Sequence, residues 1–160
     1  MFRFRLGWLV LIFGVAGCAK SPRTVVEAMR ESACKGDVAG FYAHVDRKVV
    51  EDNFWKDQLQ ALHSGSDYAS MTAEGQQATD KALEELFEKK RREIFEAWTA
   101  EMKKGEDNSL CRFSIISATE ADNYGEIRIK SPAGADKVWI MSKRADGWVL
   151  VNVRLEPVAK

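Results

Sequence analysis

The side chains that could support acid–base chemistry are few and scattered along the chain. Five could move a proton in a pocket: His44, Asp46, His63, Asp122 and Tyr124. His44 and Asp46 are two residues apart, a spacing that does not place two side chains on one face of a helix. The motifs of nucleophile elbows, phosphate loops, zinc-binding helices and Cys-x-x-Cys pairs do not occur. We therefore expect no catalysis, no metal site and no cofactor, with His44 and Asp46 as weak catalytic candidates.

The residue with the most specific sequence context is Cys18. Arg3 and Arg5 precede an apolar run of 11 residues, 6–16, which is followed by Gly17 and Cys18. This run is too short to cross a bilayer as a helix, which takes roughly 20 apolar residues. A basic start, a short apolar middle and small residues before a cleavage point are typical of a secretory signal.

The stretch Val15-Ala16-Gly17-Cys18 resembles the lipobox of bacterial lipoproteins, with valine where leucine is commoner. The resemblance implies that residues 1–17 are removed, that the Cys18 sulfur carries a lipid and that the new amino group is acylated. The protein would then be anchored at the bacterial cell envelope, on the periplasmic side. Ala19 is not the aspartate that retains enterobacterial lipoproteins at the inner membrane, so the resemblance favours the outer membrane. The alternatives are an ordinary secretory signal with an incidental cysteine and a retained membrane anchor.

Removal of residues 1–17 would leave 143 residues (160 − 17), a length that suits one domain. Residues 18–21 would form a short tether and residues 22–160 the domain, and the three residues between Cys18 and Pro22 reach only roughly 10–14 Å when extended. The mature chain would have 22 basic and 24 acidic residues, because Arg3 and Arg5 are lost with the signal. A nearly neutral chain argues against a nucleic-acid partner.

Two cysteines remain if Cys18 is lipidated, and they are Cys34 and Cys111. An oxidising compartment favours one disulfide between them, across a separation of 77 residues (111 − 34). The alternative is a pair of buried free thiols. Two cysteines without a nearby histidine pair cannot supply the four ligands of a structural metal site.

Hydrophobic periodicity predicts helices first and strands afterwards. A first helix starts near Pro22 and stops at Gly36, a second covers about 38–45, and residues 46–63 form one or two short helices before a loop at 64–73. A long helix follows over about 73–104, which either breaks near its charged residues 88–93 or overhangs the core. Four runs then alternate with a period of two and are separated by turn residues; they are 111–115, 126–130, 138–141 and 148–155. The expected fold is therefore α+β, with N-terminal helices packed on a C-terminal four-stranded antiparallel meander.

The order of these elements resembles the nuclear transport factor 2-like (cystatin-like) fold, in the short lipoprotein versions that bacteria have. The resemblance rests on the helix opening at Ser21-Pro22, the break at Lys35-Gly36-Asp37 and the closing strand Gly147-Trp148-Val149-Leu150-Val151. It implies a cone-like, curved sheet around helices, often with a pocket. Members of this fold include binding modules, assembly domains and a few enzymes such as ketosteroid isomerases, so the fold alone does not give the function.

The aromatic residues of the last two strands indicate a surface. Trp139 and Met141 share one face of their strand, and Trp148 and Leu150 share one face of the next. If the opposite face packs on helices, these four side chains form an exposed apolar patch, which is typical of an interface or a ligand site. The alternative is that the long helix covers them.

We therefore expect a non-catalytic binding module that is attached to the membrane through its N-terminal lipid. Its partner would be another envelope protein or a second copy of the chain, bound through the sheet face. The alternative is a carrier of, or an enzyme acting on, a small apolar molecule in a pocket between the sheet and the helices.

Overall fold

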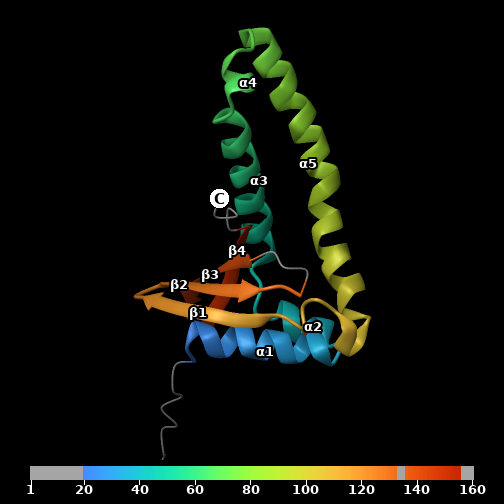
Figure 1. Ribbon diagram of the computed structural model, residues 1–160, viewed down its shortest axis with the longest axis vertical. Helices are drawn as coiled ribbons and strands as arrows, with labels where there is room; N and C mark the ends of the chain where they lie inside the picture. Colours follow the sequence, from blue (N-terminus) through green and yellow to red (C-terminus); the bar gives the residue numbers. More distant parts are fainter. Residues whose placement is uncertain (1–19, 133–135, 156–160) are drawn as a thin grey trace, which may run out of the picture.

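The computed structural model describes residues 20–132 and 136–155 (Figure 1). Its helices are α1 (Pro22–Cys34), α2 (Val38–Tyr42), α3 (Arg47–His63), α4 (Ser66–Ala69), α5 (Ala73–Met102) and the short 3-10 helix η1 (Gly105–Asp107). Its strands are β1 (Ser114–Ala121), β2 (Tyr124–Lys130), β3 (Asp136–Arg144) and β4 (Gly147–Leu155). This order confirms the α+β prediction. The predicted signal and Cys18 lie outside the described residues. Among the described helices, none combines the length and the apolar character needed to span a bilayer.

The sheet is an antiparallel meander with the strand order β1-β2-β3-β4, as the turn signals predict. Asp122 adopts the left-handed conformation (φ 44°) in the tight turn between β1 and β2, and Gly147 has φ 129° at the turn into β4. The register shifts at Ile116 on β1 and at Val151 on β4, so neither residue has a direct cross-strand partner. The first strand lies further along the chain than predicted, because residues 108–112 form a turn around Asn108 instead.

Helix boundaries follow local capping chemistry. The Ser21 hydroxyl accepts a hydrogen bond from the Thr24 amide and Pro22 occupies the first turn of α1, as predicted. Asp37 caps α2, and Thr72 caps α5. Residues 47–63 form one helix of 17 residues, and the predicted loop that follows contains the short helix α4.

The core lies between α1, α2 and one face of the sheet. Val26, Met29 and Phe41 from the helices are fully buried against Ile127 and Met141 from the sheet. The last two turns of α5, called its foot below, close one end of this core with their buried side chains. The interior is thus formed mainly by α1, α2 and the sheet, with contributions from Val50 of α3 and from the last two turns of α5.

The prediction of an exposed patch at Trp139, Met141, Trp148 and Leu150 is wrong. These four side chains are at most 2% exposed and belong to the core. The Trp139 ring contacts the rings of Phe41 (centroids 6.3 Å apart) and Phe113 (5.3 Å). The larger side chains face the helices because they bury more apolar area there. The opposite face is the one that is only partly covered, by α3 along β4.

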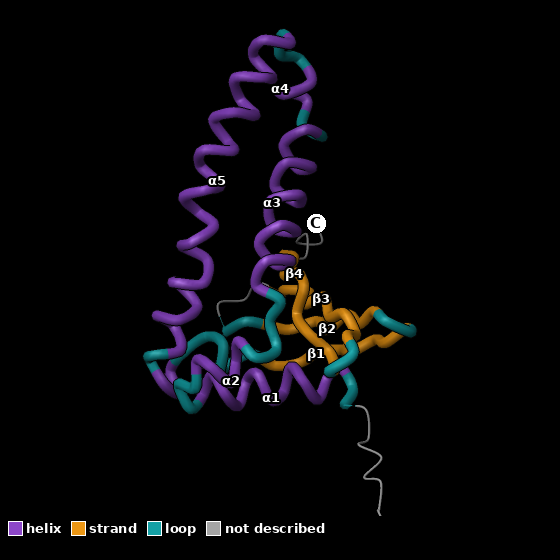
Figure 2. The backbone as a smooth tube through the Cα atoms, turned by 180° about the vertical axis from the view of Figure 1, so that it is seen from behind, coloured by secondary structure: helices purple, strands orange, loops and turns teal. Residues whose placement is uncertain are grey.

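Helices α3, α4 and α5 form an arm that projects from the sheet (Figures 1 and 2). The two long helices meet near α4 and diverge towards the rest of the fold, which consists of α1, α2 and the sheet and is called the base below. Helix α1 lies on the opposite side of the sheet from the arm. α5 is continuous over 30 residues, so it overhangs the core and does not break at its charged residues. At 1.5 Å per residue it is about 45 Å long.

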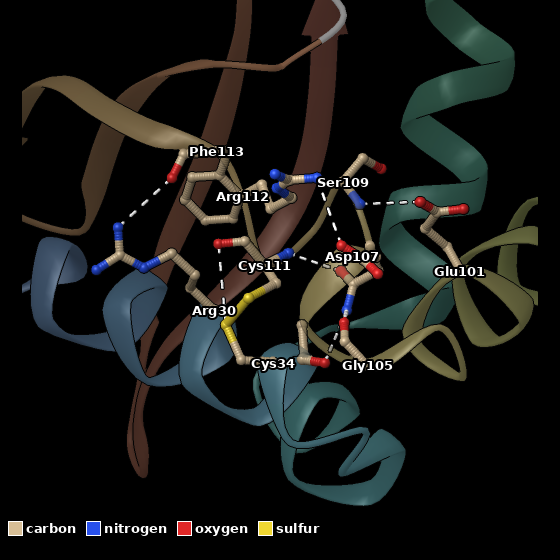
Figure 3. The surroundings of a disulfide bond; sticks show 11 residues. Arg30, Cys34, Glu101, Gly105, Asp107, Ser109, Cys111, Arg112 and Phe113 are labelled. Carbon is tan, nitrogen blue, oxygen red and sulfur yellow. Dashed lines mark hydrogen bonds and ion pairs between the residues drawn. A yellow bond between two sulfur atoms is a disulfide. The ribbon is translucent and has the colours of Figure 1, made fainter.

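Cys34 and Cys111 form the predicted disulfide, with their Cα atoms 4.7 Å apart (Figure 3). The bond joins the last residue of α1 to the segment that leads into β1. Buried Asn108 reinforces the same junction, because its side chain donates to the Ala33 carbonyl (2.9 Å) and accepts from the Cys111 amide (2.6 Å). The disulfide therefore closes a loop that contains the whole arm.

Candidate functional site

About halfway along the arm, the two long helices contact each other through aromatic rings. The Trp55 ring on α3 stacks on the Phe87 ring on α5, with centroids 4.2 Å apart and planes 23° apart. Phe87 is buried, at 6% exposed. This contact fixes the separation of the helices at the level of Trp55 and Phe87.

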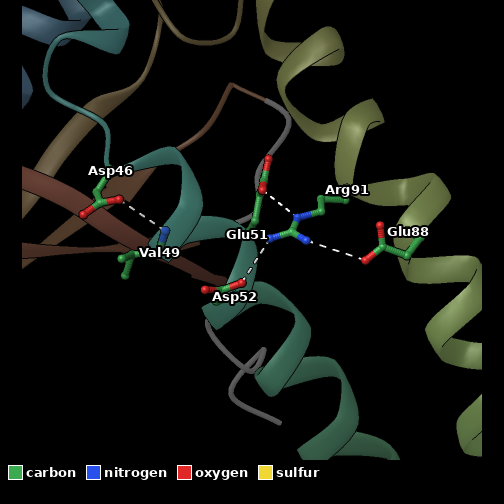
Figure 4. Close-up of polar contacts among 6 residues, drawn as sticks. All are labelled: Asp46, Val49, Glu51, Asp52, Glu88 and Arg91. Atoms are coloured by element: carbon green, nitrogen blue, oxygen red, sulfur yellow. Dashed lines mark hydrogen bonds and ion pairs between the residues drawn. The ribbon is translucent and has the colours of Figure 1, made fainter.

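One arginine bridges the helices just below the aromatic contact (Figure 4). The Arg91 guanidinium on α5 contacts Glu51 (2.6 Å) and Asp52 (3.2 Å) on α3, and also Glu88 on its own helix (3.6 Å). These carboxylates, Glu51 first, raise the pKa of Arg91. Because the guanidinium spans two acidic residues on α3, it sets the register of the helices as well as their separation.

A histidine, a tyrosine and an aspartate connect the tip of the arm. His63 Nε2 lies 3.0 Å from Asp80 Oδ1, and the Tyr68 hydroxyl donates to Asp80 Oδ2 (2.9 Å). Hydrogen bonds from His63 and Tyr68 lower the pKa of Asp80. The ends of α3 and α5 are thus joined through one carboxylate.

The base of the arm is attached to α2 by Tyr42. Its hydroxyl donates to the Phe95 carbonyl (2.9 Å) and lies 3.1 Å from the Thr99 hydroxyl. The Arg47 guanidinium lies over both rings, 5.1 Å from the Tyr42 centroid and 4.6 Å from the Phe95 centroid. These contacts place a cation at the surface beside the foot of α5.

Two open hollows lie between α3 and α5. One, of about 490 Å³, is near the tip and has Trp55 and Leu59 among polar residues; its other lining residues are His63, Gln77, Asp80, Lys81 and Glu84. The other, of about 400 Å³, is near the base and is lined by Arg47, Glu51, Phe95, Glu96, Thr99, Ala100 and Lys103. Both are lined by a mixture of apolar and charged side chains.

His44 and Asp46 lie in the connection between α2 and α3 and line neither of these hollows. The His44 backbone carbonyl accepts from the Leu150 amide (2.8 Å), while partial burial, and then the charge of Lys20, lower the pKa of its ring. Asp46 caps α3 by accepting from the Val49 amide (3.3 Å), and it pairs with Arg144 (3.3 Å). The structure therefore gives the Asp46 side chain a structural role.

The remaining acid–base candidates are separated from one another. His63 is at the tip of the arm, Asp122 is in the β1–β2 turn, and Tyr124 donates to the Glu126 carboxylate at the surface of β2. Within residues 20–132 and 136–155, no group of three histidine, cysteine or acidic side chains is placed to hold a metal ion. The fold does not assemble the five candidates into one site.

The residues that define the arm were not recognised as a site from the sequence. Trp55, Phe87 and Arg91 lie in segments whose helical period is clear, but the period alone does not show which surface each helix faces. The signal that could have indicated a helical hairpin is the turn at Ser64-Gly65 between two helices with apolar residues on one side.

Comparisons with known proteins give no relative. No protein-family model matches the chain, and neither a curated protein nor a solved structure matches it significantly. The resemblance to the nuclear transport factor 2-like fold thus stays a prediction.

Proposed function

We propose that this protein is a lipid-anchored lipoprotein of the bacterial envelope that acts as a non-catalytic binding module, with the arm as its binding element. The observation that supports this proposal is the shape of the chain. A helical arm about 45 Å long stands on a small disulfide-linked base.

The part of the arm that is furthest from the sheet does not stabilise the base. Within the part of the chain that the structure describes, the side-chain hydrogen bonds and ion pairs of residues 63–91 connect to other residues of the arm, as at His63–Asp80 and Arg91–Glu51. Removal of this part would leave the core intact, because the core residues of α5 belong to its last two turns. A projecting helical pair that does not stabilise the rest of the fold is best explained by contact with a partner.

The proposed anchor and the arm have a consistent orientation. Cys18 is four positions before Pro22, the first residue of α1, and α1 lies on the side of the sheet opposite the arm (Figure 1). A lipid on Cys18 would therefore hold the base close to the membrane and direct the tip of the arm away from it. The partner would be an envelope protein that is reached at a distance from the bilayer.

The alternative, a small apolar molecule bound between the sheet and the helices, has less support. Phe41, Phe113 and Trp139 pack against one another in that space. Open hollows remain elsewhere for such a ligand, one beside Trp55 and Leu59 in the arm and one between α3 and β4 beside Phe54 and Val153.

The experiment is native mass spectrometry of the acylated protein, extracted gently from its own membrane. It compares the full chain with a variant in which residues 60–82 are replaced by a short Gly-Ser linker, above the Trp55–Phe87 contact. We expect a defined envelope protein to accompany the full chain and to be lost from the shortened variant. A full chain that is found alone, or a partner that remains on the shortened variant, would contradict the arm as the binding element. A bound small molecule would favour the alternative.

Anchoring is tested separately. Cys18→Ser should move the protein from the membrane fraction to the soluble fraction, because it removes the thiol that would be lipidated. A variant that stays with the membrane would contradict the lipobox prediction.

A further inference from the structure

We infer that two copies of this chain pair in antiparallel orientation through their β1 strands, which joins two four-stranded sheets into one. The inference goes beyond the binding of a partner by the arm and does not depend on it. It concerns an edge of the sheet that the prediction of a sheet-face interface did not consider.

The two edge strands of the sheet differ in whether their outward-facing backbone amides and carbonyls have hydrogen-bond partners. At β4, the Leu150 amide donates to the His44 carbonyl (2.8 Å), the Asp46 amide donates to the Leu150 carbonyl (3.0 Å) and the Asn53 side chain donates to the Val151 carbonyl (2.9 Å). At β1, the described residues supply no backbone partner beyond those of β2. β1 is the front strand of the sheet in Figure 1, with α1 beneath the sheet.

β1 lacks the usual side-chain protection of an exposed edge. None of its eight residues is lysine, arginine or proline, and Glu120 is its one charged residue. Natural edge strands are commonly protected by such residues or kept very short. Ile116 is 52% exposed at the bulge, so an apolar side chain lies beside the unpaired backbone. The regular stretch available for pairing is 117–121.

The distribution of charge along β1 fits a second copy in antiparallel orientation. Arg112, which also contacts Asp107 (3.6 Å), precedes the strand and Lys130 lies opposite its first residue, whereas Glu120 and Asp122 lie at its other end. Antiparallel pairing brings the basic end of one copy towards the acidic end of the other. Parallel pairing would bring like charges together. The occupant that matches this edge is therefore the same edge of a second molecule.

Symmetric pairing of residues 117–121 has Thr119 at the two-fold axis, with Ala118 opposite Glu120 of the second copy. Thr119 is exposed, so it can contact its counterpart without disturbing the core. In this register the two Glu120 residues are not directly opposed; they are diagonal neighbours, about 7–8 Å apart. Threonine pairs across strands are favourable.

The same symmetry agrees with the proposed anchor. A two-fold axis perpendicular to the sheet keeps the α1 helices of both copies on one face of the joined sheet. If Cys18 is lipidated, both lipids can then enter the same membrane while both arms project from the other face. This point rests on the proposed function, but the pairing itself does not.

The test uses the full chain with Cys18→Ser, so that the result does not depend on the lipid. We expect analytical ultracentrifugation to show a concentration-dependent dimer. Thr119→Lys places two like charges at the axis and should raise the dissociation constant at least tenfold, roughly, since opposed like charges across an interface cost several kcal/mol. A protein that is monomeric at every accessible concentration, or a dimer that tolerates Thr119→Lys, would overturn the inference.

A second variant tests the register directly. Thr119→Cys should form a disulfide-linked dimer under mild oxidation, because directly opposed strand residues have Cα atoms about 4.5–5.5 Å apart, which suits a disulfide. The matched control is Asp146→Cys, in the exposed β3–β4 turn, which should not be crosslinked. Equal crosslinking of the two variants would contradict pairing at β1. A dimer that is abolished by the Gly-Ser replacement of residues 60–82 and not by Thr119→Lys would assign self-association to the arm instead.

Discussion

The Trp55 ring on α3 stacks on the Phe87 ring on α5, with their centroids 4.2 Å apart. This contact is an apolar connection between two helices that diverge below it. It lies beside the ion pairs of Arg91, so the middle of the arm is stabilised both by ring contact and by charge. The stability of the arm should therefore depend on a few residues at this level.

Trp55→Ala should loosen the arm without unfolding the base. The loss should be about 1–2 kcal/mol of local stability, because the substitution removes a ring contact and part of the apolar burial. Hydrogen exchange should show faster exchange of α3 and α5 amides above residue 55 and unchanged protection in the sheet. Leu86→Ala is the matched control, because Leu86 is adjacent to Phe87 but 49% exposed, and it should have little effect. Uniform loss of protection in the sheet would show that the arm and base unfold together.

The double substitution Cys34→Ala and Cys111→Ala should lower the free energy of unfolding by about 2–4 kcal/mol. The physical reason is the entropy that the unfolded chain regains when the 77-residue separation is no longer closed. Urea unfolding gives the change, and reduction of the unsubstituted protein should produce a similar loss. A double variant as stable as the oxidised protein would show that Asn108 and the core alone hold this junction.

Trp139→Ala should be strongly destabilising, by about 3–5 kcal/mol, because it leaves a cavity among Phe41 and Phe113. A surface tryptophan would have little effect on stability, so this substitution separates the core position from the predicted interface. Thermal or urea unfolding is the measurement. The exposed Tyr124, changed to Ala, is the control and should cost much less. Similar small losses for both variants would contradict the burial of Trp139.

Stability should fall on acidification through the protonation of His44. Partial burial, followed by the charge of Lys20, lowers the pKa of His44 from its ordinary 6.5. In the window below 6.5 the unfolded chain then binds more protons than the folded protein, so the free energy of unfolding decreases as the pH falls. Urea midpoints at about pH 7.5 and 5.5 should differ less in His44→Gln than in the unsubstituted protein. An unchanged pH dependence in His44→Gln would contradict the assignment.

The local features of the fold could be predicted from residues in sequence. Ser21-Pro22 and Gly36 mark the ends of α1, and the alternation of Ile127 and Ile129 marks β2. The turn residues require the meander, because short connections between strands permit only antiparallel neighbours. The disulfide could be predicted once Cys18 was assigned to a lipid, because only two cysteines remained. Each of these predictions depends on interactions between near neighbours or on a simple count.

The face of the sheet that is buried was decided by the tertiary structure. Val138-Trp139-Ile140-Met141 is apolar on both faces, so alternation does not show which side contacts α1 and α2. The packing of Phe41 and Met29 against Trp139 and Met141 decides it, because the larger rings fill the space between helix and sheet.

The arm shows the same division. The helical period of residues 73–102 is sufficient to predict α5, but a helix has the same period whether it packs on a sheet or on another helix. Residues 55 and 87 are 32 positions apart (87 − 55), and their rings meet only because α4 reverses the chain between them. The sequence by itself determined the type and order of the elements, through local hydrogen bonding and periodic burial. Tertiary structure decided which surfaces are buried and which project, because these depend on contacts between side chains that are distant in sequence.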